Sequence, residues 1–257
     1  MTDKEYILFY DSGIGGLTTL IESIKLLPNE NYIYFADSKN CPYGQKSKET
    51  IRNLVMDNIA TIMTKYKLKS MVIACNTATS AAIEDIRNLY PIPIIGIEPN
   101  ITEPVKFGFN HICVLATEYT AHGQKLLKLE QKYTASFTNI SIKNLAYLTE
   151  QYYYRKQKKL EQKIKIIIRK KLLFIPKTTA IVLGCTHYVF HRKYIESLGY
   201  HCFDGNLGTV CALKKKISLR NNETRKKTIP IFISNNPIKP DLKLKKIFIC
   251  LTRRLIK

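Results

Sequence analysis

Short apolar runs alternate with amphipathic stretches along most of this chain of 257 residues. The runs are continuously apolar rather than alternating, as expected for strands that are buried on both faces of a sheet. The stretches between them repeat apolar residues at helical spacing. This pattern predicts an α/β protein with parallel strands and helices on both faces. The expected strands are residues 6–10, 32–36, 70–74, 94–97, 111–115 and 179–183, and the expected helices are residues 17–27, 48–66, 77–89 and 150–171, with another after Thr186.

One local arrangement occurs twice and predicts two similar α/β halves. The run SMVIA leads into Cys75 and a helix, and the run TAIVLG leads into Cys185 and a second predicted helix. The alternating pattern restarts after Pro99, and a strand is expected again at residues 228–234. We therefore expect two chain crossings, near Glu98 and Gly208. The predicted domains are residues 1–97 with 209–257, and residues 98–208.

The net charge of +21 is concentrated at residues 155–171 and 214–257. Neither stretch contains a nucleic-acid-binding motif, so we favour a solvated basic surface over a nucleic-acid site. Residues 150–171 fit an amphipathic helix packed on a sheet, with a membrane-surface helix as the less favoured alternative. No run is long and apolar enough to span a bilayer.

The seven cysteines are scattered, odd in number and without a CxxC pair. This argues against a disulfide framework and against a zinc site. The N-terminal residues do not resemble a signal peptide. We expect a cytoplasmic protein with reduced thiols, most of them serving as small buried apolar residues.

Ligands of open α/β sheets bind beyond the carboxyl ends of the strands, and polar segments follow the predicted strands there. The glycine segment that starts at Gly13 lacks both the third glycine of a GxGxxG fingerprint and the GK[ST] of a P-loop. What remains is a tight strand-to-helix turn with exposed N–H groups. Asp11, at the end of its strand, is placed to form a hydrogen bond with a partner.

Cys75 and Cys185 are each expected between a buried strand and a helix N-terminus, which favours thiolate over thiol. The N–H groups there, with the hydroxyls of Ser12, Thr77 and Thr186, can hold carboxylates. A thiol hydrolase would use one cysteine with a histidine and leave the other cysteine idle. Racemisation uses both, because one thiolate removes the α-proton and a thiol supplies a proton to the opposite face.

The motifs FYDSGIGGLT, YFADSKNCPYGQKS, IACNTATSAA, GIEP, LATEYT and LGCTHY resemble glutamate racemases of the aspartate/glutamate racemase superfamily. They span most of residues 5–190, and NCPYG with GCTHY distinguishes glutamate racemases within the superfamily. The resemblance implies two flavodoxin-like parallel-sheet domains related by pseudo-twofold symmetry, with the active site in the cleft between them. It also implies an enzyme without pyridoxal phosphate or metal, whose product, D-glutamate, feeds peptidoglycan synthesis.

The resemblance also assigns roles to individual residues. Cys75 would deprotonate D-glutamate and Cys185 would deprotonate L-glutamate, with assistance from Asp11 and His187. Glu150 is a further candidate. The residues expected to bind substrate are Asp11, Ser12, Pro42, Tyr43, Gly44, Asn76, Thr77, Thr117, Thr120 and Thr186.

Three departures and several alternatives accompany this assignment. Val189 replaces the usual proline, the segment before Glu150 is shortened, and the match after Asp204 is weak. Aspartate racemase is the nearest alternative, and His187 argues against it. A two-lobed amino-acid-binding protein and a basic nucleic-acid-binding protein are alternatives without turnover. A homodimer is left open, since the sequence does not determine the oligomeric state.

Overall fold

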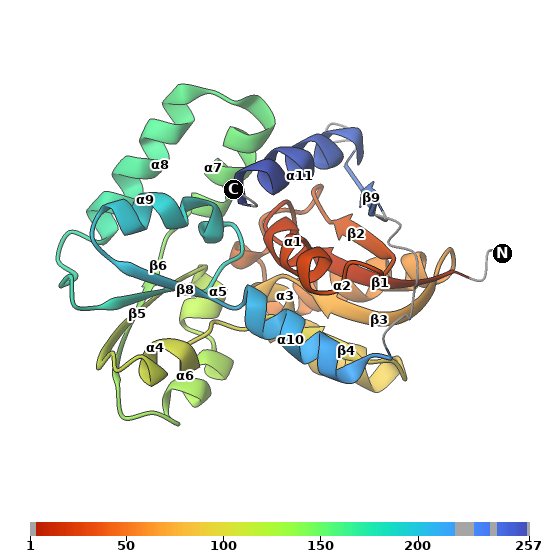
Figure 1. The fold of residues 1–257 in the computed structure, drawn as a ribbon, viewed down its shortest axis with the longest axis horizontal. Coiled ribbons are helices and arrows are strands. Elements are labelled where there is room, and N and C mark those ends of the chain that lie inside the picture. Colours follow the sequence, from red (N-terminus) through yellow and green to blue (C-terminus); the bar gives the residue numbers. More distant parts are fainter. Residues whose placement is uncertain (1–3, 219–228, 237–240, 256–257) are drawn as a thin grey trace. The chain divides into compact units, whose positions relative to one another are not determined.

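The computed structural model describes residues 4–218, 229–236 and 241–255 (Figure 1). The chain divides into two compact units, Met1–Ile97 with Asn206–Lys257, and Glu98–Gly205. Gly208, near which the return crossing is expected, lies in helix α10 (Asn206–Lys216), and the units divide just before this helix, between Gly205 and Asn206. The strand expected at residues 228–234 corresponds to β9 (Ile231–Ser234), and residue 228 lies outside the described residues.

The first unit has a five-stranded sheet in the order β4-β3-β1-β2-β9, with every neighbouring pair parallel. The strands are β1 (Glu5–Asp11), β2 (Tyr32–Ala36), β3 (Lys67–Ile73), β4 (Ile94–Gly96) and β9 (Ile231–Ser234). The helices are α1 (Leu17–Leu26), α2 (Lys48–Met63), α3 (Asn76–Leu89), α10 and α11 (Asp241–Leu255), with a short 3-10 helix η1 (Tyr43–Gln45). Because neighbouring parallel strands end at the same sheet edge, Asp11 at the end of β1 lies at the same edge as Asp37, which follows β2, and Cys75, which comes shortly after β3.

The second unit has a four-stranded parallel sheet in the order β6-β5-β7-β8. The strands are β5 (His111–Ala116), β6 (Ser136–Ser141), β7 (Ala180–Leu183) and β8 (His201–Asp204). The helices are α4 (Thr102–Lys106), α5 (Glu118–Ala121), α6 (Gln124–Glu130), α7 (Leu145–Arg155), α8 (Lys158–Lys171), α9 (Arg192–Ser197) and the 3-10 helix η2 (Tyr188–His191).

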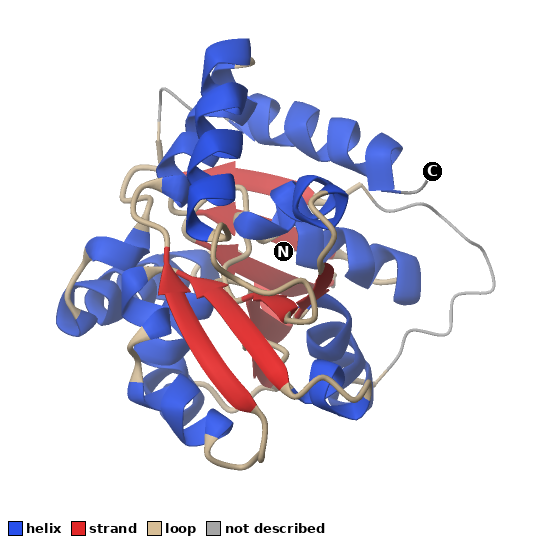
Figure 2. Ribbon diagram, turned by 90° about the vertical axis from the view of Figure 1, so that its left-hand side faces the viewer, coloured by secondary structure: helices blue, strands red, loops and turns tan. Residues whose placement is uncertain are grey.

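Helices cover both faces of this second sheet, and successive residues of β5 face opposite ways. Cys113 and Leu115 pack with α7 and α8, whereas Ile112 and Val114 pack with residues of α5 and α6. Figure 2 shows strands enclosed by helices in this way. The predicted α/β class with two parallel-sheet sets is confirmed.

The prediction of a single helix over residues 150–171 is wrong. Two helices, α7 and α8, occupy this region, and the break lies at Lys156, whose φ of 56° is left-handed. Two strands were not predicted, β6 and β8. Both lie at the edges of their sheet, where SFTNIS and HCFD do not form long apolar runs.

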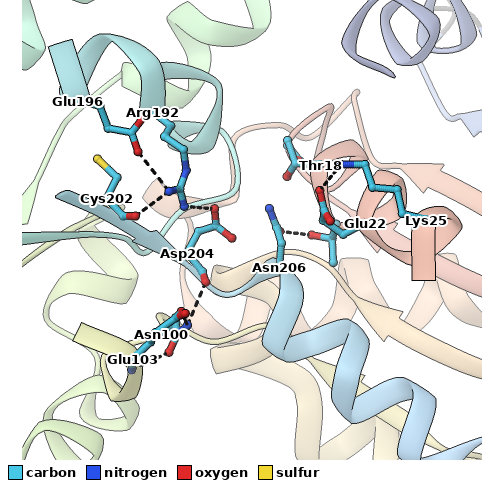
Figure 3. A network of polar contacts seen from close by, with 12 residues as sticks. Thr18, Glu22, Lys25, Asn100, Glu103, Arg192, Glu196, Cys202, Asp204 and Asn206 are labelled. Carbon is cyan, nitrogen blue, oxygen red and sulfur yellow. Dashed lines mark hydrogen bonds and ion pairs between the residues drawn. The ribbon is translucent and has the colours of Figure 1, made fainter. Parts of the chain in front are cut away.

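The ends of the second unit are tied together by polar contacts near β8 (Figure 3). Arg192 donates to the Cys202 carbonyl and to Asp204 Oδ2, both over 2.6 Å. Asn100 Nδ2 donates to the Asp204 carbonyl over 3.2 Å and to Glu103 Oε2 over 2.7 Å. The start and the end of the unit are therefore joined by hydrogen bonds. None of the helices in the described part of the chain is both long and apolar enough for a membrane span.

Helix α8 offers a matched test of core packing. Ile168 is fully buried in the core on one side of the second sheet, whereas Ile166 on the same helix is 55% exposed. We expect Ile168→Ala to lower the free energy of unfolding by about 2–5 kcal/mol, because it leaves a cavity. Ile166→Ala should change it by less than about 0.5 kcal/mol. Urea titrations of the two variants measure the difference, and equal losses would contradict this packing.

Candidate functional site

Asp11 organises the turn that follows β1. Its side chain is buried, and Oδ1 accepts the Gly13 N–H over 2.6 Å. A Cβ at Gly16 would lie 2.9 Å from the Cβ atoms of both Ala74 and Asp11, so a glycine is needed there. Helix α1 therefore starts in close contact with the ends of β1 and β3, and several N–H groups of the turn lie at the sheet edge.

Cys75 is the N-cap of α3, as predicted. Its sulfur accepts the Ala78 N–H over 3.5 Å and lies 3.8 Å from Ser12 Oγ, to which the thiol donates. The sulfur thus lies where an N–H group and the helix dipole stabilise a thiolate. Asn76 and Thr77 follow in the first turn and are buried. Asn76 Oδ1 has no hydrogen-bond partner among the described residues.

Pro42, Tyr43 and Gly44 lie in the loop between β2 and α2. The Tyr43 side chain is buried, and its hydroxyl donates to Asp37 Oδ2. Burial, with Tyr10 and Asp37 nearby, raises the pKa of Tyr43 far above its usual range, so the phenol stays protonated. Because the Tyr43 hydroxyl is already hydrogen-bonded to Asp37 and Tyr10, we expect the loop to bind a ligand through its backbone groups.

In the second unit, Gly184 and Cys185 follow β7 directly. A Cβ at Gly184 would lie 3.1 Å from Val114 Cγ1 and 3.2 Å from Ala116 Cβ, so the chain passes close to β5. The α-helix predicted after Thr186 is wrong: a turn leads into η2, and α9 begins only at Arg192. Cys185 therefore does not occupy the N-terminus of an α-helix, unlike Cys75.

A buried histidine–glutamate pair stands beside Cys185. His187 Nδ1 lies 4.0 Å from the Cys185 sulfur, and Nε2 lies 2.8 Å from Glu150 Oε1. His187 and Glu150 are 2% and 1% exposed, so the contact between them is shielded from water. Because Glu150 accepts a hydrogen bond from Nε2–H, the lone pair of neutral Nδ1 faces the sulfur and can take the thiol proton.

The remaining predicted residues of the second unit lie at the same sheet edge. Thr117 follows β5, which pairs with β7, and its hydroxyl donates to Thr120 Oγ1 over 3.2 Å. Thr186 is buried beside Cys185. The hydroxyl of Tyr188 contacts the carbonyls of Ala116 and Ile142 at 3.1 and 3.0 Å and anchors the turn that carries these residues.

The other buried cysteines of the second unit differ from Cys185 in their surroundings. Cys113 lies in the middle of β5 and Cys202 lies in β8. Burial is the main cause that raises the pKa of each thiol to about 12, so both remain protonated. All seven cysteines lie in the described part of the chain, and none of them forms a disulfide there.

The structure adds residues that the sequence did not single out. Asp37 lies in the motif YFADSKNCPYGQKS, which gave it no role, and Asn235 lies in no motif. Asp37 starts the loop that carries Tyr43 and accepts from its hydroxyl, and Asn235 contacts the same loop through Asp37 and the Lys39 N–H. Asp37 at the end of its strand was a visible feature, whereas nothing near Asn235 in the sequence indicates its contacts.

Comparison with known proteins identifies related chains. The family model "Asp/Glu/Hydantoin racemase" matches residues 19–210. A glutamate racemase from Clostridium novyi is 40% identical over 253 residues, covering 95% of this chain and 96% of that protein. One from Clostridium botulinum is 38% identical, covering 88% and 90%. The structure of Escherichia coli glutamate racemase with L-glutamate and the activator UDP-MurNAc-ala superposes with a TM-score of 0.80, at 23% identity and covering 98% and 95%.

Proposed function

The chain belongs to the Asp/Glu/hydantoin racemase family of isomerases, and we propose that it interconverts L- and D-glutamate without a cofactor. The observation that carries this proposal is the pair of cysteines at equivalent strand ends, Cys75 after β3 and Cys185 after β7. Relatives about 40% identical over nearly the whole chain are named glutamate racemases, which supports glutamate as the substrate.

In the proposed mechanism, Cys75 and Cys185 serve opposite faces of the α-carbon. For L-glutamate, the Cys185 thiolate removes the α-proton, and the Cys75 thiol donates its proton to the other face. This leaves Cys185 as a thiol and Cys75 as a thiolate, which is the state that accepts D-glutamate. Proton exchange with solvent resets the pair, so no net proton is gained or lost in a turnover.

Groups near Cys75 can bind the charged ends of the substrate and stabilise the carbanion. The N–H groups of the first turn of α3, with the hydroxyls of Ser12 and Thr77, suit a carboxylate. The buried Asn76 Oδ1 suits the ammonium group, because it is an acceptor that lacks a partner among the described residues. Asp11, which we propose assists Cys75, holds the neighbouring turn.

Cys185 has no α-helix N-terminus to stabilise its thiolate. We propose that His187 and Glu150 stabilise this thiolate instead. The pair places a basic nitrogen 4.0 Å from the sulfur, so His187 can take the thiol proton and stabilise the thiolate. Thr117, Thr120 and Thr186 are proposed to bind substrate in the second unit. In the first unit, the backbone of the loop that contains Pro42 and Gly44 is proposed to bind substrate as well. We further propose that the D-glutamate formed supplies peptidoglycan synthesis.

A test of this function incubates the purified protein with L-glutamate and no added cofactor. We expect optical rotation to decay to zero, because the two enantiomers are equally stable in water. The same assay with L-aspartate measures specificity and should show much slower turnover. Equal or faster turnover of aspartate would favour aspartate racemase instead, and no change with either substrate would favour a binding protein.

A further inference from the structure

The end of β9 lies beside the end of β2 and reaches the loop that follows β2. The two strands are parallel, with Ala36 paired with Ser234, so Asp37 and Asn235 emerge next to each other. Asn235 Nδ2 donates to Asp37 Oδ1, and the Lys39 N–H donates to Asn235 Oδ1 over 3.1 Å. One amide side chain therefore contacts the loop through both its donor and its acceptor.

Asp37 connects this contact to the rest of the loop. Its carboxylate is fully buried and also accepts from Asn40 Nδ2 over 2.9 Å and from the Tyr43 hydroxyl. A buried carboxylate is tolerated when several donors satisfy it, and these donors come from three different side chains. The loop therefore closes around Asp37, and Asn235 is the donor from outside the loop.

A second line of hydrogen bonds fixes the orientation of Tyr43. Because its hydroxyl donates to Asp37, it accepts from the Tyr10 hydroxyl, 2.6 Å away. Asn58 Nδ2 in turn donates to the Tyr10 hydroxyl over 3.0 Å. Each hydrogen bond in this line is donated in the direction of Asp37, from Asn58 through the two tyrosines. The Asp37 carboxylate, which can only accept, therefore sets the direction of donation along the whole line.

We propose that Asp37 and Asn235 are positioning residues that hold residues 37–44 in the conformation that receives glutamate. This rests on the proposed function, since Pro42, Tyr43 and Gly44 matter only if that loop binds substrate. Asn235 lies beyond residue 210, where the family match ends. The described part of the C-terminal region thus contributes to the site through Asn235, although it carries no proposed catalytic group.

The donor and acceptor pattern allows a reciprocal exchange. Asn235→Asp places a second carboxylate against Asp37 and removes the donor between them, so the two acceptors repel. Asp37→Asn replaces one acceptor oxygen by an NH₂ group at a position where three side chains donate, so at least one donor then faces another donor. In the double variant, the amide at position 37 donates to the carboxylate at position 235, which still accepts the Lys39 N–H. The Tyr43 hydroxyl keeps an acceptor at position 37.

The experiment measures two quantities on the full chain: hydrogen exchange of peptides that cover residues 37–46, and the KM and kcat for L-glutamate. We expect each single variant to speed exchange in the loop and to raise KM by about tenfold or more, the loss typical of a hydrogen bond to a charged group. The change in kcat should be smaller. The double variant should recover most of the wild-type protection and KM.

Asn53→Asp is the matched control, because it makes the same charge change at an exposed position on α2. It should leave both quantities at wild-type values. Unchanged exchange and KM in Asn235→Asp, or a double variant no better than the worse single variant, would overturn the proposal. Loss of protection throughout β1 as well as the loop would also overturn it, since the role would then be general stability. If the wild type does not racemise glutamate, the proposed function fails, and hydrogen exchange of the loop alone decides whether Asp37 and Asn235 hold residues 37–44.

Discussion

Replacing either Cys75 or Cys185 by alanine should lower the rate of glutamate racemisation by at least about 10³-fold in both directions. Each direction needs one base and one acid, and a positioned acid or base contributes about 10²–10⁴-fold. The double variant should be little worse than either single variant, because the two thiols act as a unit. Polarimetry from each pure enantiomer measures the loss. Cys211→Ala is the control, since that thiol is exposed on α10.

Isotope exchange separates the two cysteines. Early in a reaction of the wild type in D₂O, the product enantiomer should carry deuterium while the remaining substrate is still protiated. A Cys75→Ala variant should still exchange the α-proton of L-glutamate slowly, because Cys185 remains, without forming D-glutamate. A Cys185→Ala variant should do the same with D-glutamate. Product that retains the original proton, or appreciable racemisation by either variant, would contradict the two-base mechanism.

The sequence predicted the elements whose pattern is local. Strand β2 was expected at residues 32–36 and is found there, because five continuously apolar residues between polar segments allow no other boundary. The cap at Cys75 was also predictable, since the Ala-rich stretch that follows it favours a helix. The stretch after Cys185 includes Tyr188, Val189 and Phe190, which are weaker helix formers, and the turn there is held by Tyr188.

The features that the sequence did not predict depend on distant residues. Asn235 meets Asp37 across 198 positions, and no periodicity in either segment reveals that contact. His187 and Glu150 come from a turn and a helix 37 positions apart. Glu150 was a candidate only through resemblance, because a glutamate in a basic helical stretch usually lies in solvent. Its burial follows from the position of α7 against β5 and β7, which is a property of the folded unit.

Glu150→Gln should lower kcat/KM for glutamate by about 10–100-fold, the loss typical of a hydrogen bond to a charged group. The glutamine amide keeps the size of the side chain but loses the charge that stabilises protonated His187, and it no longer fixes Nε2 as the donor. The Cys185 thiolate would then lose its cationic neighbour. Stopped-assay kinetics from both enantiomers measure the effect, and Glu161→Gln is the control, since that carboxylate forms a surface ion pair with Lys165 on α8.

The two directions of the reaction constrain the result of this substitution. Because L- and D-glutamate are equally stable in an achiral solvent, kcat/KM must fall by the same factor from either enantiomer. The separate kcat values carry no such constraint, and the larger fall should appear with L-glutamate, for which Cys185 is the base. His187→Asn should show the same asymmetry, and combining it with Glu150→Gln should add little, because Glu150 acts through His187. A Glu150→Gln enzyme with wild-type rates would show that the buried pair serves folding alone, and losses that add in the double variant would show that Glu150 acts independently of His187.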